Sequence, residues 1–168
     1  HYPLRRQRQM CIRDSPDAEA APILNWDDAL DAALTLDINS SGWEAEEQLR
    51  AALVDAALTH VSEEGLGVLL AHLTAQLSET LHELAEEALY MADELPDHVI
   101  DLAVGAGQQA AYGAALVLAA GGAQDPDASE ANADATSEIL SHPLMLKYRL
   151  FAAGRWPLTL TGQTLNIF

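Results

Sequence analysis

The longest apolar stretch of the chain is residues 97–121, DHVIDLAVGAGQQAAYGAALVLAAG. Drawn as a helix, it is apolar on almost every side, and a helix without a polar face belongs in a core. Ala106, Ala110 and Ala114 recur along it at helical spacing. Rows of such small side chains let neighbouring helices approach closely. We therefore predict that this stretch is the central helix of a helical bundle.

The same stretch is long enough to cross a bilayer, which takes about 20 apolar residues. Asp101, Gln108 and Gln109 lie within it, and its flanks are acidic, with no Lys or Arg nearby to set an orientation. We predict a buried core helix and no membrane contact. Gly105 and Gly107 leave open a division into two shorter helices, because glycine weakens a helix interior.

Amphipathic patterns precede the central helix, and each repeats apolar residues at steps of three or four. They predict helices at about 26–37, 42–62 and 66–94. Asn25 suits the N-cap of the first helix, and Ser41 with Glu44 has the spacing of a capping box for the second. We expect residues 63–65, Glu-Glu-Gly, to end the second helix.

The third of these helices has the clearest division into two faces. Its apolar stripe consists of Leu66, Leu70, Leu73, Leu77, Leu81, Leu84, Ala88, Met91 and Leu95. Its polar stripe consists of His72, Gln76, Glu79, Glu83, Glu86, Tyr90 and Asp93. This pattern predicts one face on the core and the other in solvent.

The remaining segments predict loops, short helices and a hairpin. Residues 16–25 read as a polar lead-in, and residues 121–136 as an acidic, exposed loop. A short helix follows Thr136 and Ser137, and Pro143 begins another that Gly154 ends. Residues 157–168 alternate around Gly162-Gln163, the pattern of a β-hairpin.

These elements together predict an all-α fold, a bundle of five to six helices around a central apolar helix, with a small C-terminal β-hairpin. The expected core residues are Leu53, Leu73, Leu77, Leu84, Val104, Leu116 and Leu118.

Residues 1–15, HYPLRRQRQMCIRDS, differ from everything that follows. They hold Arg5, Arg6, Arg8 and Arg13, which are four of the eight basic residues, and the only cysteine, Cys11. The segment RRQRQMCIRDS resembles a translated sequencing-adapter read-through of the kind found in reading frames assembled from metagenomic DNA. We therefore expect residues 1–15 to be foreign and residues 16–168 to form one domain. No apolar signal-peptide region is present.

The charge balance of residues 16–168 narrows the function. They keep four basic and 25 acidic residues, because only Asp14 of the 26 acidic residues lies before them, so their formal net charge is −21. Such a charge makes nucleic acid and anionic membranes unsuitable partners. The commoner explanation of this charge is solubility in high salt. The more specific explanation is an acidic face that binds a basic partner. Residues 16–168 contain no cysteine, which is consistent with a reducing compartment, and we expect the protein in the cytoplasm.

Two groups of residues are candidates for partner contact. The first group follows the polar stripe of the third helix and consists of four acidic residues and a tyrosine: Glu79, Glu83, Glu86, Tyr90 and Asp93. The basic candidates gather near the C-terminus: Lys147, Arg149, Arg155 and Trp156. Arginine at such a place can hold a carboxylate or another anion in a bidentate manner. We favour a structural role for the basic group, in which it anchors the last helix to an acidic body.

A metal site is the alternative chemistry. Glu79 and His82 have the Glu-x-x-His spacing of half a di-iron site in a helical bundle, and His98 with Asp101 forms a second acid–imidazole pair. No second Glu-x-x-His is present, and a solvated helix face is the favoured interpretation.

The function expected from the sequence is therefore that of a non-enzymatic, acidic helical interaction module that binds a basic protein, as an inhibitor or immunity-type protein does. The alternative is a metal- or small-ligand-binding bundle, with or without enzymatic activity, that uses Glu79, His82, His98 and Asp101. No cofactor is predicted, and the oligomeric state is open.

Overall fold

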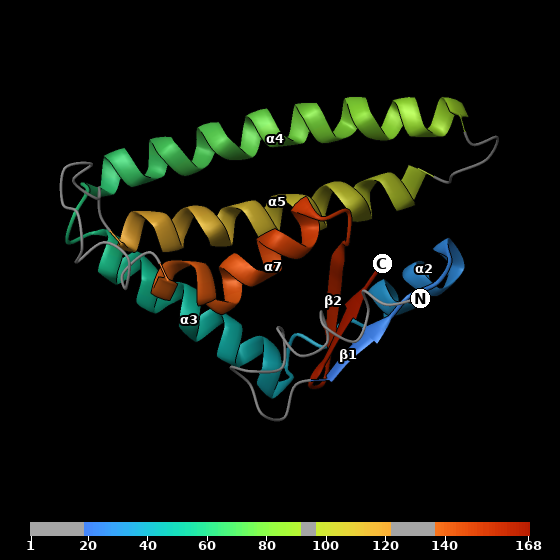
Figure 1. Cartoon of the computed structure of the whole chain (residues 1–168), viewed down its shortest axis with the longest axis horizontal. Helices are drawn as coiled ribbons and strands as arrows, with labels where there is room; N and C mark the ends of the chain where they lie inside the picture. Colours follow the sequence, from blue (N-terminus) through green and yellow to red (C-terminus); the bar gives the residue numbers. More distant parts are fainter. Residues whose placement is uncertain (1–18, 92–96, 122–136) are drawn as a thin grey trace.

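The computed structural model describes residues 19–91, 97–121 and 137–168, without the side chains of residues 19, 84–86, 88–91 and 97–100. The described residues form six helices and one three-stranded sheet (Figure 1). The elements are β1 (Glu19–Pro22), α2 (Trp26–Leu34), α3 (Ser41–Ala57), α4 (Glu63–Met91), α5 (Asp97–Ala120), a short helix at 137–141, α7 (Pro143–Ala152), β2 (Pro157–Thr161) and β3 (Thr164–Ile167). The predicted helical bundle with a C-terminal hairpin is confirmed. The expected foreign segment 1–15 and most of the loop 121–136 lie outside the described residues.

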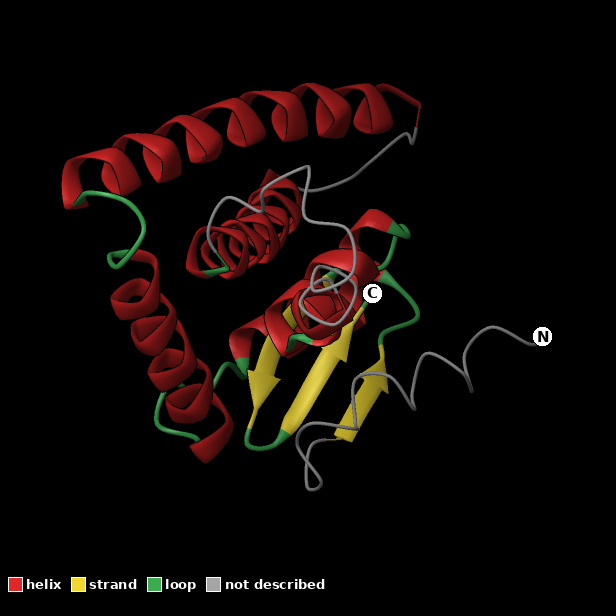
Figure 2. Ribbon diagram, turned by 60° about the vertical axis from the view of Figure 1, so that its left-hand side comes forward, coloured by secondary structure: helices red, strands yellow, loops and turns green. Residues whose placement is uncertain are grey.

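The helix α5 is the centre of the bundle, as its sequence predicts. It packs against α3, α4 and α7, and Figure 2 shows it lying among these three helices. It runs without interruption through Gly105 and Gly107, so the division into two helices does not occur. One described helical segment, Asp101–Ala120, is long and apolar enough to cross a bilayer, and 56% of it is buried inside the molecule.

Small residues on α5 bring the neighbouring helices close. A Cβ atom at Gly107 would lie 2.6 Å from Cδ1 of Leu81 on α4 and 3.0 Å from Cζ of Phe151 on α7. The alanine row also lies in the core, and Ala110 is 1% exposed. Close approach therefore depends on the absence of side-chain volume at these positions.

The predicted core is correct in part. Val104 and Leu116 are buried, and Leu116 is fully so. Leu53, Leu73 and Leu77 are half-buried, and the side chain of Leu84 lies outside the described set. The prediction for Leu118 is wrong, because 55% of this residue is exposed. Leu118 shares its side of α5 with the buried Gly107 and Ala111, about 20° away around the helix, but it stands in the last turn of α5.

Side-chain caps determine where the first two helices begin. Asn25 Oδ1 accepts a hydrogen bond from the backbone N–H of Asp28 at 2.8 Å, which confirms the predicted N-cap of α2. For α3 the cap is Ser40 rather than Ser41, and its Oγ accepts from the N–H of Trp43 at 3.2 Å. The hydroxyl thus satisfies one of the N–H groups that a helix start leaves without a partner.

The boundary between α3 and α4 also differs from the prediction. The helix α3 ends at Ala57, and Glu63 and Glu64 begin α4 instead of ending α3. Ser62 Oγ accepts from the N–H of Gly65 at 3.1 Å, so it acts as an N-terminal cap. Acidic side chains stabilise the positive end of a helix dipole, and this explains their place in the first turn.

The predicted C-terminal hairpin forms, and its turn contains Gly162 at a φ of 61°, a conformation that glycine adopts without strain.

The sheet has a third strand that the sequence did not predict. β1 pairs in parallel with β3, so the strand order is β1-β3-β2 and residues 19–22 are not merely a lead-in. Trp26, Trp156 and Phe168 pack together beside the sheet, and the rings of Trp26 and Phe168 stack at 4.1 Å. The two ends of the described chain thereby join in one layer.

Candidate functional site

The predicted acidic face lies on the solvent side of α4. Glu79 and Glu83 are exposed, as is Glu87, and the three glutamates stand four residues apart, about 6 Å of helix rise between neighbours. Among the described elements, α4 packs mainly against α5, and its first turns also contact α3, where Leu66 and Ala57 share a buried cluster; its far side stays open. Figure 1 shows α4 along the outer edge of the molecule.

The other three candidates of this group, Glu86, Tyr90 and Asp93, lie outside the described side chains. The side chains of Glu86 and Tyr90 are not described, and neither is Asp93. Glu87 was missed by the sequence analysis, which followed the stripe from Glu83 to Glu86. The signal was present in the sequence, because Glu83 and Glu87 are four residues apart and lie on one side of a helix.

The same side of α4 also exposes large apolar residues. Val68 is 64% exposed and Leu69 is 48% exposed. At 100° per residue, Leu69 lies directly above Glu87 on the helix surface, and Val68 lies within about 20° of Glu79. We call Val68, Leu69, Glu79, Glu83 and Glu87 the α4 outer face. It combines an apolar end with an acidic end.

The candidate metal residues do not converge among the described side chains. Glu79, His82 and Asp101 are all exposed, while the side chain of His98 is not described. The Nδ1 atom of His82 lies 2.7 Å from the carbonyl oxygen of Ser78, one turn earlier on its own helix. Within the described residues, no three His, Cys, Asp or Glu side chains are placed to hold a metal ion.

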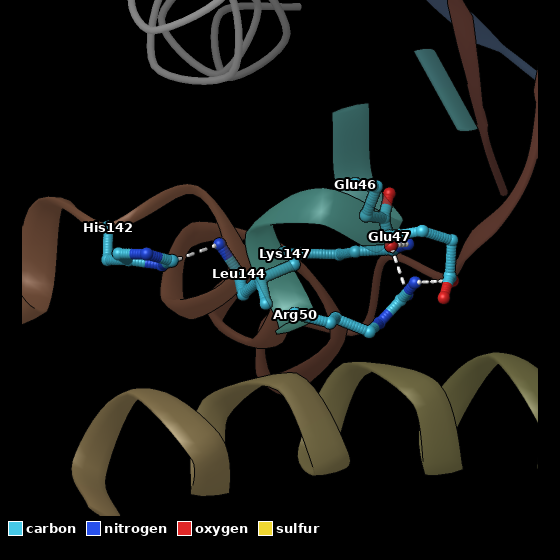
Figure 3. A network of polar contacts seen from close by, with 6 residues as sticks. All are labelled: Glu46, Glu47, Arg50, His142, Leu144 and Lys147. Atoms are coloured by element: carbon cyan, nitrogen blue, oxygen red, sulfur yellow. Dashed lines mark hydrogen bonds and ion pairs between the residues drawn. The ribbon is translucent and has the colours of Figure 1, made fainter. Parts of the chain in front are cut away.

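The predicted basic group divides between two places. Lys147 Nζ donates to Glu46 Oε1 at 2.8 Å, which joins α7 to α3 (Figure 3). The Arg50 guanidinium donates to both Glu46 and Glu47 in the same network. The side chains of Lys147, Arg50 and Glu46 are only 12%, 14% and 15% exposed. The charge of Lys147 therefore has a structural partner.

The other members of the basic group have different surroundings. Trp156 belongs to the aromatic layer with Trp26 and Phe168. Arg149 is exposed and Arg155 is half-buried. Lys147 faces α3, whereas Trp156 packs on a residue of α2, so the structure does not assemble the four predicted residues into one anion site.

A pocket of about 280 Å³ lies between α3, α4 and α5, and the sequence analysis did not predict it. Its lining consists of Trp43, Glu47, Arg50, Thr74, Gln108, Gln109 and Tyr112. Gln108 and Gln109 are polar interruptions of the central apolar helix, which the sequence shows but does not explain. Both glutamines lie on the pocket wall, which accounts for polar residues at these positions. This location becomes visible only when the three helices are packed together.

Comparisons with known proteins found no matching family model, no matching curated protein and no matching solved structure.

Proposed function

We propose that this protein is a non-enzymatic interaction module that binds a basic protein partner through the α4 outer face, as an inhibitor or immunity-type protein does. The single observation that carries the proposal is the row Glu79, Glu83 and Glu87, exposed on a helix whose main described packing partner is α5. No lysine or arginine occurs in α4 to neutralise this row.

The acidic row supplies orientation and rate of association more than affinity. An exposed ion pair contributes only about 0.2–1 kcal/mol, because solvent screens it. Three carboxylates in a row attract a complementary basic row over a Debye length of about 8–10 Å at physiological salt and disfavour acidic competitors.

The apolar end of the face supplies contact area. Leu69 lies ten residues before Glu79, about 15 Å along the helix. An apolar anchor beside a charged rim is the usual composition of a protein interface. The expected partner surface therefore has basic side chains at one end and an apolar site about 15 Å away. The cytoplasm is the compartment that we propose for this interaction.

Selection of binding peptides tests the proposal without a known partner. A displayed library of helical peptides is selected against the full chain at low salt, and the selected peptides are measured by fluorescence anisotropy. We expect basic peptides whose affinity falls as KCl rises, and whose binding to the double variant E79K/E83K is at least tenfold weaker.

The matched control is D55K/E138K, which changes the net charge equally at two exposed residues away from α4. This variant should bind the selected peptides within about twofold of the unmodified chain. If E79K/E83K and D55K/E138K weaken binding equally, general charge and not the α4 outer face is responsible, and the proposal is wrong.

A further inference from the structure

The pocket between α3, α4 and α5 gives two glutamines an unusual position. Gln108 is half-buried and Gln109 is exposed, on a helix whose buried positions are all Ala, Gly, Val or Leu. Burial of an amide without a hydrogen-bond partner costs free energy, so the half-buried Gln108 needs a partner in the pocket or in solvent. Neither amide makes a hydrogen bond to any described protein group, and both line the pocket. Their carbonyl oxygens and N–H groups are available to a ligand.

Two aromatic side chains complete the walls. Trp43 comes from the first turn of α3, and Tyr112 lies one helical turn after Gln108 on α5. The described aromatic contacts involve other rings, so neither of these two rings is stacked on another described ring. Unstacked indole and phenol faces attract cations through the ring quadrupole.

The charges at the pocket oppose an anionic ligand. Arg50 donates to Glu46 and Glu47, and Lys147 donates to Glu46, so two cations and two carboxylates compensate each other. The side chain of Glu47 is 52% exposed, whereas that of Arg50 is 14% exposed, so the carboxylate is the more accessible charge. The whole chain carries a net charge of −18, which attracts cations to this opening.

We infer that this pocket binds an organic cation, a guanidinium or ammonium group on an alkyl stem. The Glu47 carboxylate pairs with the charge, the rings of Trp43 and Tyr112 contact the stem and the cation, and the amide oxygens of Gln108 and Gln109 accept its N–H groups. The volume of about 280 Å³ lies just below the range of typical ligand cavities, roughly 300–1,000 Å³. It therefore suits a group the size of an arginine side chain.

This inference is independent of the α4 outer face. Thr74, the α4 residue on the pocket wall, lies about 140° around the helix from Glu79. Failure of either proposal leaves the other standing.

The test is a titration of the full chain, labelled with ¹⁵N, using N-acetyl-arginine amide as the probe. We expect saturable shifts of the Trp43 indole N–H and of the side-chain amides of Gln108 and Gln109. The indole signals of Trp26 and Trp156 should stay in place, because both rings belong to the aromatic layer beside the sheet. The Trp43 signal is assigned with the variant W43F.

Matched probes and variants define the ligand class. N-acetyl-citrulline amide, the neutral counterpart, should bind at least tenfold more weakly. The variant E47Q should weaken binding of the arginine probe at least fivefold, whereas D55N, an exposed carboxylate of the same helix outside the pocket, should leave it unchanged. Arg50 keeps its contact with Glu46 in E47Q, so the fold is retained.

The source of the cation is distinguished by a second probe, agmatine. Tighter binding of agmatine than of N-acetyl-arginine amide identifies a free small molecule, and equal or weaker binding identifies a side chain presented by a polypeptide. The inference is overturned if the citrulline probe binds as well as the arginine probe, if E47Q binds as well as D55N, or if Trp43 shows no saturable shift.

Discussion

At the scale of single residues, two glycines of α5 have opposite surroundings. A methyl group at Gly107 would overlap Leu81 and Phe151, whereas nothing lies within 4 Å of the corresponding position at Gly105. We expect Gly107→Ala to destabilise the protein by about 1–3 kcal/mol through overpacking. Gly105→Ala should stabilise it by about 0.5–1 kcal/mol, since alanine favours the helix.

Urea denaturation followed by far-UV circular dichroism measures both variants. Each serves as the control for the other, because both replace a glycine by alanine in the same helix. If Gly107→Ala were as stable as Gly105→Ala, the close packing of Leu81 and Phe151 on α5 would be contradicted.

The sequence predicts the close approach of helices to α5 but not which glycine requires it. Helical spacing of small residues is a local property and is visible in the chain. The groups that fill the space above Gly107 come from α4 and α7, far away in sequence. The error at Leu118 has a similar cause, because its side of α5 is buried at Gly107 and Ala111 but not in the last turn, and the residues that cover Gly107 come from other helices.

At the scale of elements, the junction of α3 and α7 depends on Glu46. Its carboxylate accepts from both Lys147 and Arg50, and all three side chains are mostly buried. Glu46→Gln should destabilise the protein by about 1–3 kcal/mol, because two cations lose their shared partner while they remain largely out of water.

Thermal unfolding in parallel with Glu47→Gln provides the comparison. Glu47 bonds the same guanidinium but is 52% exposed, so its loss should cost less than about 1 kcal/mol. Equal losses in the two variants would mean that the contact between Glu46 and Lys147 adds nothing to the joining of α7 and α3.

Helices and hairpins whose formation depends on residues close in sequence were predictable. A strand whose pairing partner lies far away in sequence was not. The helices follow from apolar periodicity, and the hairpin follows from alternation around Gly162. The strand β1 has only four residues, and its partner β3 lies at the other end of the chain. Nothing in residues 19–22 alone distinguishes a strand from a lead-in, because the parallel pairing forms only in the complete fold.

At the scale of the whole molecule, the two candidate sites differ in how visible they are in the sequence. The acidic row of α4 is visible because four-residue spacing places its members on one side of a helix. The pocket needs Trp43 from α3, Thr74 from α4 and Gln108 from α5 to meet, and no spacing within one helix encodes that meeting. The glutamines in an apolar helix were its only trace.

The net charge makes a last prediction about the molecule as a whole. With 26 acidic and eight basic residues, the chain repels itself, and salt relieves this repulsion by shortening the Debye length from about 30 Å at 0.01 M to 3 Å at 1 M. We expect the Tm of the full chain to rise with KCl. The variant E79K/E83K should melt higher than the unmodified chain at 0.01 M KCl and at nearly the same temperature at 1 M KCl.

The form of the salt dependence separates the two explanations of the acidity. A chain that folds only near molar KCl owes its composition to a saline environment, and the charge then says little about a partner. A chain that melts cooperatively at 0.01 M KCl tolerates the repulsion without that reason. A gain in stability from E79K/E83K at low salt would then mean that the acidic row is kept at a cost to folding, as expected of a surface retained for binding.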